Sequence, residues 1–296
     1  MSFSSCVSNP FYKVTLETAP RSGVEAAAAL EKLSWKISIE AENKHICGGV
    51  ILNSWWILSA AHCFTKELPP DLHVIVGLKG YAKKRRMLDR IVIHQDFNNA
   101  SMANDIALIL LDSPIKFSKK MLISVPLMHD LSMWKDCSVS RWSSIMAGGE
   151  KRPISTLQEV ETTLISNKQC SQSVQGLTED MLCAISEEGR EGLCEGDSGG
   201  PLVCTYGDII VEWFVVGIAS RGDSCGGEDS PVVYTLVFSY LDWIQTATTR
   251  EGKPFIPEGR DDVIDTSIRS GAVQNHFASD SPLLPLVCLI LIVYKL

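Results

Sequence analysis

The sequence has no excess of basic residues, and this limits the partners that the chain can bind. It contains 27 lysines and arginines against 35 aspartates and glutamates, which gives a formal net charge of −8. Because nucleic-acid binding needs a basic face, this balance argues against a nucleic-acid partner. The 296 residues fit one large domain or two small ones, and a hydrophobic content of 45 % allows a sizeable core.

The ten cysteines contain no CxxC pair, and the only cysteine beside a histidine is Cys63, which follows His62. A metal site is therefore the weaker interpretation, and we expect no metal and no other cofactor. We expect disulfides instead, which are typical of an oxidising compartment. The sequon Asn99-Ala100-Ser101 fits such a compartment and makes Asn99 a candidate glycosylation site on a surface loop.

The first 21 residues lack the apolar stretch of a signal peptide, so we interpret the start as an atypical or incomplete N-terminus. The apolar run at residues 283–296 is shorter than the roughly 20 residues that span a bilayer. Small residues at 270–272 and a polar spacer precede it, which favours a GPI attachment signal and a membrane location. A tail-type membrane segment and a buried or disordered tail are the alternatives.

Short runs rich in valine, isoleucine and leucine, separated by Gly, Pro, Asn and Asp, follow one another from about Trp35 to Tyr240. This pattern predicts an all-β sandwich or barrel rather than alternating strands and helices. Residues 238–250 have helical spacing and are expected to close the domain. The expected organisation is a leader-like segment at 1–21, the folded domain at 22–250, a polar linker at 251–282 and the apolar tail at 283–296.

Three segments carry residues suited to nucleophilic catalysis: SAAHCF with His62, NDIALILL with Asp105, and GDSGGP with Ser198. Taken singly, each has a plain structural interpretation as a structural histidine, a turn or cap aspartate, and a turn serine. Together they match what a serine nucleophile needs, which is an adjacent base that a carboxylate orients. Gly196 allows unusual backbone geometry, so the N–H groups of Gly196 and Ser198 are candidates for an oxyanion hole.

The segments CGGVILNSWWILSAAHC, NDIALILL and GDSGGPLVC resemble the trypsin-like serine peptidases of the chymotrypsin fold, over roughly residues 21–250. The resemblance implies two six-stranded antiparallel β-barrels with a C-terminal helix, and an active site in the cleft between the barrels. It implies a serine endopeptidase that acts on protein or peptide substrates, with His62, Asp105 and Ser198 in the family's roles. The REGKPF segment and the apolar tail further resemble the membrane-anchored, testis-type branch.

The resemblance also implies a pairing of eight cysteines. The implied disulfides are Cys47–Cys63, Cys137–Cys204, Cys170–Cys183 and Cys194–Cys225. Two cysteines are left over: Cys288 lies in the tail, and Cys6 is expected to be free or to pair outside the chain.

The activation segment departs from the family pattern. The resemblance implies cleavage after Arg21, after which the new amine at Ser22 would pair with Asp197. Ser22 and Gly23 would bury less apolar surface than the usual isoleucine and valine, and each lost large aliphatic side chain costs about 1.5–3 kcal/mol. We therefore expect activation by the usual route to be weakened.

The implied substrate pocket differs as well. Gly192 stands where trypsin-like members hold an aspartate, so the basis for cleavage after arginine or lysine is missing. Val232 replaces a wall glycine and would make the pocket shallow, whereas Ser220 and Gly222 keep the family's residues. The sequence therefore predicts a preference for small or medium apolar residues at the cleaved position.

Three further departures affect the groove. Arg221 replaces a tryptophan there, and it either pairs with Glu191 or Glu195 or is a solvated surface arginine. The SRWS segment at 140–143 replaces two glycines that support the oxyanion site, and a sugar on Asn99 would restrict large substrates. The altered N-terminus, the pocket changes and Arg221 favour an alternative function, a pseudoprotease that serves as a surface binding or adhesion module. Nothing in the sequence indicates the oligomeric state.

Overall fold

The structure is a computed structural model, and most of its regular elements are β-strands. It describes residues 35–42, 44–76, 84–116, 124–126, 130–141, 144–147, 150–153, 158–186, 197–206, 210–222 and 230–257. The leader at 1–21, most of the segment predicted as a linker, and the apolar tail lie outside these ranges. Among the helices of the described residues, none is long and apolar enough to cross a membrane.

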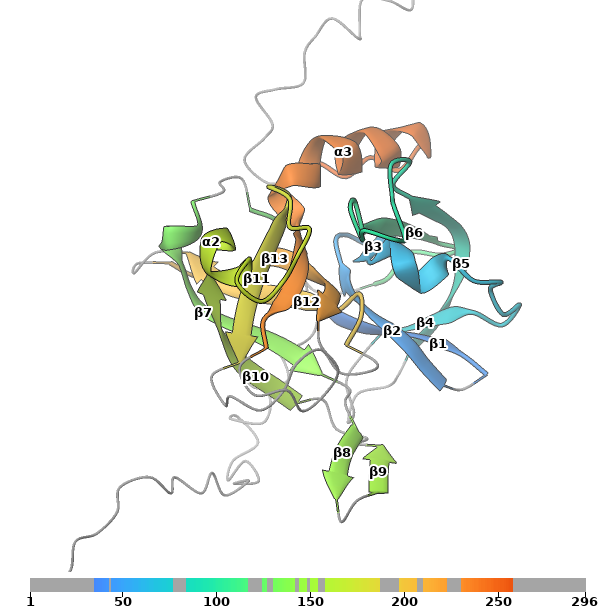
Figure 1. The fold of residues 1–296 in the computed structure, drawn as a ribbon. Coiled ribbons are helices and arrows are strands. Elements are labelled where there is room, and N and C mark those ends of the chain that lie inside the picture. The colour runs from blue at the N-terminus through green and yellow to red at the C-terminus, as the bar shows by residue number, and fades with distance from the viewer. Residues whose placement is uncertain are drawn as a thin grey trace, which may run out of the picture. The chain divides into compact units, whose positions relative to one another are not determined.

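Six strands form the first closed barrel, in the order β1-β2-β3-β6-β5-β4 (Figure 1). Its strands are β1 (Lys36–Ala41), β2 (Lys44–Ile51), β3 (Trp56–Ser59), β4 (His73–Val76), β5 (Lys84–Ile93) and β6 (Ala107–Leu111). Every neighbouring pair is antiparallel.

Six more strands form the second closed barrel, in the order β10-β11-β14-β13-β12-β7. Its strands are β7 (Trp134–Arg141), β10 (Gln158–Ile165), β11 (Met181–Ser186), β12 (Pro201–Tyr206), β13 (Ile210–Gly222) and β14 (Val232–Leu236). Strands β8 (Ser144–Ala147) and β9 (Glu150–Pro153) pair as a separate two-stranded sheet. The predicted fold of two six-stranded antiparallel barrels is confirmed.

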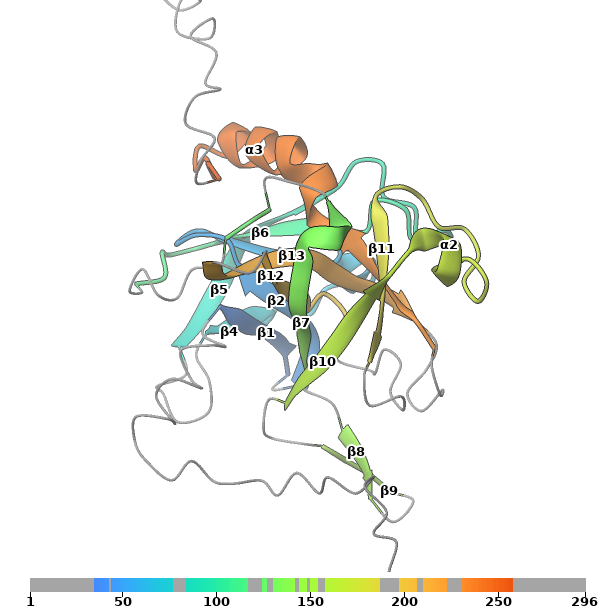
Figure 2. The same cartoon turned by 90° about the vertical axis from the view of Figure 1, so that its left-hand side faces the viewer.

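The helical elements are short, and the last of them closes the domain. They are η1 (Ala61–Phe64), η3 (Leu131–Met133), α2 (Asn167–Cys170), η4 (Val237–Tyr240) and α3 (Leu241–Arg250). Helix α3 follows η4 directly and lies across one end of the barrels in both views (Figures 1 and 2). The helix predicted at 238–250 is therefore present, with its first residues in a tighter 3₁₀ turn.

Strand β6 contains no polar residue because both of its faces are buried. Ala107, Ile109 and Leu111 pack inside the first barrel. Leu108 and Leu110 point the other way, into a cluster between the barrels. Side chains alternate across a strand, so a strand between two apolar clusters must be apolar throughout.

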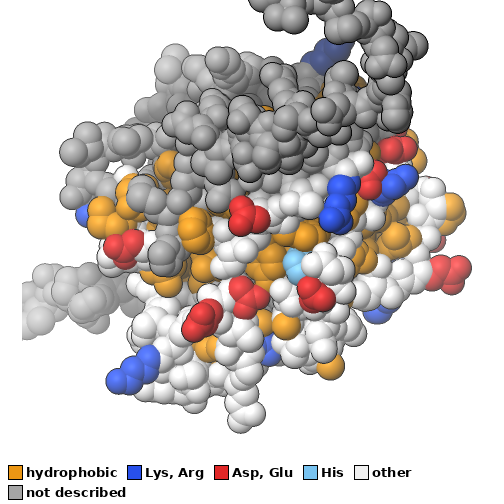
Figure 3. Space-filling model, turned by 90° about the horizontal axis from the view of Figure 1, so that it is seen from above, with side chains coloured by type: hydrophobic (Ala, Val, Ile, Leu, Met, Phe, Trp, Pro, Cys, Tyr) orange, Lys and Arg blue, Asp and Glu red, His pale blue; other side chains and the backbone are white. Residues whose placement is uncertain are grey.

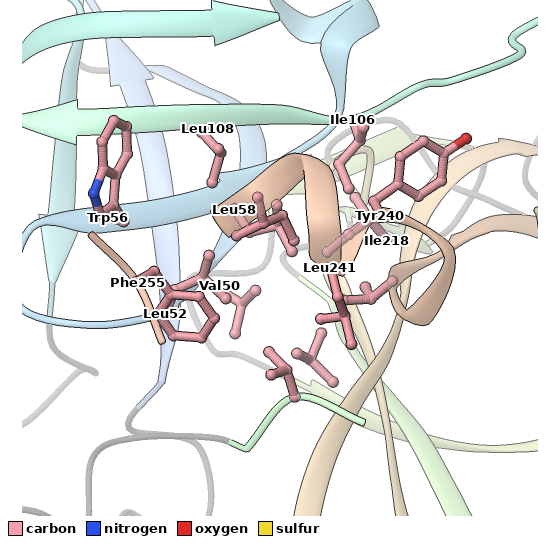
Figure 4. Packing of buried hydrophobic residues seen from close by; sticks show 14 of the residues in the cluster. Val50, Leu52, Trp56, Leu58, Ile106, Leu108, Ile218, Tyr240, Leu241 and Phe255 are labelled. Atoms are coloured by element: carbon pink, nitrogen blue, oxygen red, sulfur yellow. The ribbon is translucent and has the colours of Figure 1, made fainter. Parts of the chain in front are cut away.

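The cluster between the barrels draws residues from both of them and from α3 (Figure 4). Val50 and Leu58 come from the first barrel, Ile218 comes from β13, and Leu241 comes from α3. All four are at most 2 % exposed. This shared core fixes the two barrels against each other and places the strand ends that carry the candidate site.

The residues after α3 continue to pack on the first barrel. Trp56 Nε1 donates to the carbonyl oxygen of Lys253 at 2.6 Å. Phe255 is buried, and its backbone N–H donates to Thr248 Oγ1 at 3.0 Å. The packed chain therefore reaches at least Pro257, seven residues into the segment that the sequence predicts as a linker.

Three disulfides staple the fold, and they are three of the four pairs that the resemblance implies. They join Cys47 to Cys63, Cys137 to Cys204 and Cys170 to Cys183. The expected partners Cys194 and Cys225, and the leftover cysteines at positions 6 and 288, lie outside the described residues.

We expect Leu108→Ala to lower the free energy of unfolding by about 2–5 kcal/mol, because it opens a cavity in the core between the barrels. Leu68→Ala is the control, since Leu68 is 38 % exposed and a surface change costs within about 0.5 kcal/mol. Denaturant unfolding with the disulfides intact measures both. Equal losses in the two variants would contradict the packing described for β6.

Candidate active site

The side chains of His62 and Asp105 meet at the edge of the first barrel. His62 lies in η1, directly after β3, and Asp105 lies two residues before β6. His62 Nδ1 lies 2.7 Å from Asp105 Oδ2, and the His62 backbone N–H donates to Asp105 Oδ1 at 2.9 Å. Asp105 is fully buried, and the His62 side chain is 17 % exposed. Because the carboxylate accepts at Nδ1, a neutral His62 leaves Nε2 with the lone pair that a base needs.

Strand β13 of the second barrel adds a further donor to this carboxylate. Ser220 Oγ donates to Asp105 Oδ2 at 2.5 Å. The pairing of β13 with β14 shifts at this point, since Ala219 pairs with Tyr234 and Arg221 pairs with Val233. Ser220 is thus the extra residue of a β-bulge, and bulges commonly redirect a side chain. The bulge lets Ser220 reach a residue of the other barrel.

Asp105 is also held through its backbone, where Thr235 Oγ1 donates to the carbonyl oxygen at 2.8 Å. A buried carboxylate is costly unless its oxygens accept hydrogen bonds. Here both carboxylate oxygens and the carbonyl oxygen have donors. The surroundings therefore hold Asp105 in one orientation.

Glycines let the loop that carries Ser198 lie directly against the backbone of the first barrel. Gly48 N–H donates to the Ser198 carbonyl oxygen at 2.8 Å, and a Cβ on Gly48 would lie 2.8 Å from Gly200 Cα. Gly199 has φ +74°, and a Cβ there would lie 2.4 Å from Ser59 Oγ. Only glycine fits at these positions. The CGG and GDSGGP segments therefore contact each other across the two barrels.

Ser198 and His62 lie on loops that these contacts bring to the same region. Within the part of the chain that the structure describes, Ser198 Oγ makes no hydrogen bond to His62, and His62 Nε2 lies 4.0 Å from Cys63 Sγ. Catalytic hydrogen bonds are often long before a substrate binds, so this separation does not exclude a reaction. The grouping of Cys47, His62 and Cys63 offers no thiolate to a metal, because its two sulfurs form a disulfide.

A small pocket lies behind the serine loop, with room for about one water molecule. The wall includes Ser140, Asp197, Ala219 and Val232. Asp197 is 7 % exposed and Val232 is 4 % exposed. Val232 thus fills space at a wall where the resemblance expects a glycine.

Arg221 takes an arrangement that neither sequence interpretation anticipated. Its Nη2 donates to the carbonyl oxygens of Gln175 and Gly176, at 3.0 and 2.9 Å. The side chain is half-buried, and Gly222 beside it is exposed. Glu191 and Glu195, the expected partners, lie outside the described residues.

Asn99 is exposed in a turn before Asp105, so its side chain is accessible for modification. Asn98 Oδ1 accepts from the backbone N–H groups of Ala100 and Ser101, which shapes this turn. Of the SRWS segment, Ser140 and Arg141 end β7, and the next two residues lie outside the described ranges.

Gly192, Gly196, Arg21 and Ser22 lie outside the residues that the structure describes, so their predicted roles stay predictions.

A partly buried polar network beside Asp105 was not found from the sequence. Asn104 has φ 55°, and its Nδ2 donates to the Asp96 carbonyl oxygen at 2.9 Å. Tyr240 Oη donates its single proton to Asp180 Oδ2 and lies 3.1 Å from Asn104 Oδ1. The network spans distant parts of the chain, so no local pattern could reveal it.

Burial and hydrogen bonding shift the pKa values of Tyr240, Asp180 and the neighbouring His94. Burial raises the pKa of Tyr240 well above its ordinary value, and the carboxylate of Asp180 adds to the shift. Burial alone would raise the pKa of Asp180, but hydrogen bonds from Thr178 and Tyr240 outweigh it and lower that pKa. Burial lowers the pKa of His94, against the opposing charges of Asp96 and Asp180.

The face drawn in Figure 3 carries acidic and basic side chains interspersed among hydrophobic ones. The described residues of this face present no broad basic patch. This mixture of charges is consistent with the net negative charge of the chain.

Comparison with known proteins identifies relatives over most of the chain. Residues 21–244 match the family model for trypsin. Among solved structures, the fold matches mouse neuropsin, a serine protease expressed in the limbic system of the brain, with a TM-score of 0.64 and 27 % identity. The match covers 74 % of this chain and 96 % of the neuropsin chain.

We expect the fold to lose stability as the pH falls below about 6.5, in part because of His94. Its lowered pKa means that the unfolded chain takes up a proton before the native state does, so acid favours unfolding. His94→Gln removes this contribution and should show a smaller fall in Tm between pH 7.5 and 5.5. Gln95→Ala, an exposed neighbour, is the control and should keep the original fall. An unchanged pH dependence in His94→Gln would refute this role.

Proposed function

Because this chain belongs to the trypsin family of serine proteases, we propose that it is a serine endopeptidase that cleaves peptide bonds through an acyl-enzyme. The observation that most supports this proposal is the 2.7 Å contact between His62 Nδ1 and the buried carboxylate of Asp105. In its neutral form, a histidine held in this way carries its lone pair on Nε2, the atom that acts as the base.

In the proposed mechanism, Ser198 Oγ attacks the carbonyl carbon of the scissile bond while His62 Nε2 takes the serine proton. Asp105 keeps His62 oriented and stabilises the imidazolium that forms. The N–H groups of Gly196 and Ser198 would bind the developing oxyanion. His62 then gives its proton to the leaving amine, and water attacks the acyl-enzyme by the same route.

The proposed specificity is for small or medium apolar residues at the cleaved position. Two residues support it: Gly192 supplies no carboxylate for a basic side chain, and buried Val232 occupies a pocket wall. The proposal also places Ser220 and Gly222 along the groove beside Val232; the contact of Ser220 with Asp105 and the exposure of Gly222 are in keeping with this.

The proposed activation step is cleavage after Arg21, with the amine of Ser22 pairing with Asp197. The burial of Asp197 beside a small pocket supports this step, because a buried carboxylate is a fitting partner for an amine. The three disulfides are typical of a secreted or extracellular protease.

A second candidate function is that of a pseudoprotease that binds peptides or surfaces without efficient turnover. Its support is the missing hydrogen bond between Ser198 Oγ and His62 among the described residues, together with the unusual Arg221. The two candidates differ in one property, the nucleophilicity of Ser198.

A fluorophosphonate probe tests that property on protein cleaved after Arg21. The proposed peptidase should be labelled, Ser198→Ala should not be labelled, and His62→Ala should react at least about 10³-fold more slowly. Labelling of the unaltered protein at the level of Ser198→Ala would exclude the peptidase and favour the pseudoprotease.

A peptide library tests the pocket. We expect cleavage after residues such as alanine and valine, and we expect Val232→Gly to raise kcat/KM for larger residues by about tenfold, because it removes side-chain volume from the wall. Leu68→Ala, an exposed change away from the site, should leave the profile unchanged. Efficient cleavage after arginine or lysine by the unaltered protein would contradict the proposed specificity.

A further inference from the structure

We propose that Arg221 makes the peptide-binding groove selective for an acidic residue in the segment that precedes the scissile bond. This inference deepens the proposed function and rests on it for cleavage, but peptide binding can be measured without catalysis.

Arg221 lies one residue beyond the contacts that build the site. The Ala219 carbonyl oxygen accepts from Gly199 N–H at 2.9 Å, directly beside Ser198, and Ser220 Oγ contacts Asp105. Arg221 and Gly222 pair with β14 along one edge of β13. In the described ranges, no backbone hydrogen bond occupies their other edge. An extended peptide can add there as a further strand.

A peptide added in this way would place its residues beside Arg221 at a defined distance from Ser198. Strands advance about 3.3 Å per residue. Arg221 therefore lies within reach of side chains about two to four residues before the scissile bond.

The guanidinium of Arg221 is held in place by the loop between α2 and β11. Its Nη2 donates to two carbonyl oxygens, those of Gln175 and Gly176. Gly176 has φ +69°, a conformation that favours glycine and turns this loop toward Arg221. Met181 Sδ lies 3.8 Å from the same nitrogen. A side chain fixed in this way loses little further freedom when it binds a ligand.

Among the residues that the structure describes, no carboxylate forms an ion pair with the guanidinium of Arg221. Its hydrogen-bond acceptors there are neutral carbonyl oxygens, and its Nε is buried without a hydrogen-bond partner. Asp180, on the same loop, is instead bound by the Tyr240 hydroxyl. A half-buried guanidinium with neutral partners favours a carboxylate ligand, which a guanidinium binds through charge-assisted hydrogen bonds.

The competing explanation is that Arg221 only holds the α2–β11 loop against β13. A loop clamp would affect stability and would not distinguish a glutamate from a glutamine in the peptide. A measurement of charge selectivity therefore separates the two roles.

The experiment uses the full chain with Ser198→Ala, so that peptides bind without being cleaved. Fluorescent peptides of about eight residues carry valine at the cleaved position and either glutamate or glutamine at the second, third or fourth residue before it. Fluorescence anisotropy should give a Kd about tenfold lower for a glutamate peptide than for its glutamine match, and the ratio should fall as salt rises.

In Arg221→Gln this glutamate preference should disappear, and in Arg221→Trp it should disappear as well, so the result does not depend on one variant folding. Arg250→Gln, which removes an exposed charge on α3, should keep the preference. Equal binding of the paired peptides by the Ser198→Ala chain, no measurable binding of any glutamate peptide, or a preference that survives in a folded Arg221 variant would overturn the proposal.

These outcomes are separate from those for catalysis. A chain that binds glutamate peptides through Arg221 but takes up no fluorophosphonate keeps the role of Arg221 in selecting acidic peptides and loses the peptidase function. A chain that labels at Ser198 but binds both peptides equally keeps the peptidase function and loses the role of Arg221.

Discussion

The contact between two backbones, Gly48 of the first barrel and Gly199-Gly200 of the second, is the constraint on which the candidate site depends. A single methyl group at Gly48 would collide with Gly200, and one at Gly199 would collide with Ser59. Because these backbones touch, the Gly48 N–H can donate to the Ser198 carbonyl oxygen. The serine loop is thus positioned by the barrel that carries His62, although it belongs to the other barrel.

A second link between the barrels consists of hydrogen bonds, and here residues of the second barrel hold a residue of the first. Ser220 and Thr235 belong to the second barrel, and both donate to Asp105, which belongs to the first. The apolar cluster beneath them makes the same connection through Leu58 and Ile218. Backbone contact, hydrogen bonds and apolar packing therefore all fix one relation, the position of Ser198 relative to His62 and Asp105.

The sequence predicted the fold class correctly, and it indicated three candidate catalytic residues, because both leave local signals. Short apolar runs predict strands, and His62, Asp105 and Ser198 lie in recognisable segments. The beginning of strand β5 carries Lys84, Arg85 and Arg86, so it lacks the apolar run that predicts a strand. The bulge at Ser220 has no periodic signature.

The contacts around Asn104 were beyond prediction for a related reason. Tyr240 lies 136 positions after Asn104 and 60 positions after Asp180 along the chain, and only the folded barrels bring these residues together. The carbonyl oxygens that Arg221 binds could not be predicted, because they belong to a loop with no chemical signature. Sequence patterns thus indicated what the site contains, and packing determined how its parts are held.

The segment after α3 gives the domain a mechanical property. Lys253 and Phe255 attach the chain to Trp56 of β3 and to Thr248, so a pull on the chain beyond Pro257 meets these contacts before it reaches the end of the helix. Load would pass into the wall of the first barrel through Trp56 and into the last turns of α3 through Thr248. A domain pulled from this end would keep the packing of its barrels under tension until these two contacts break.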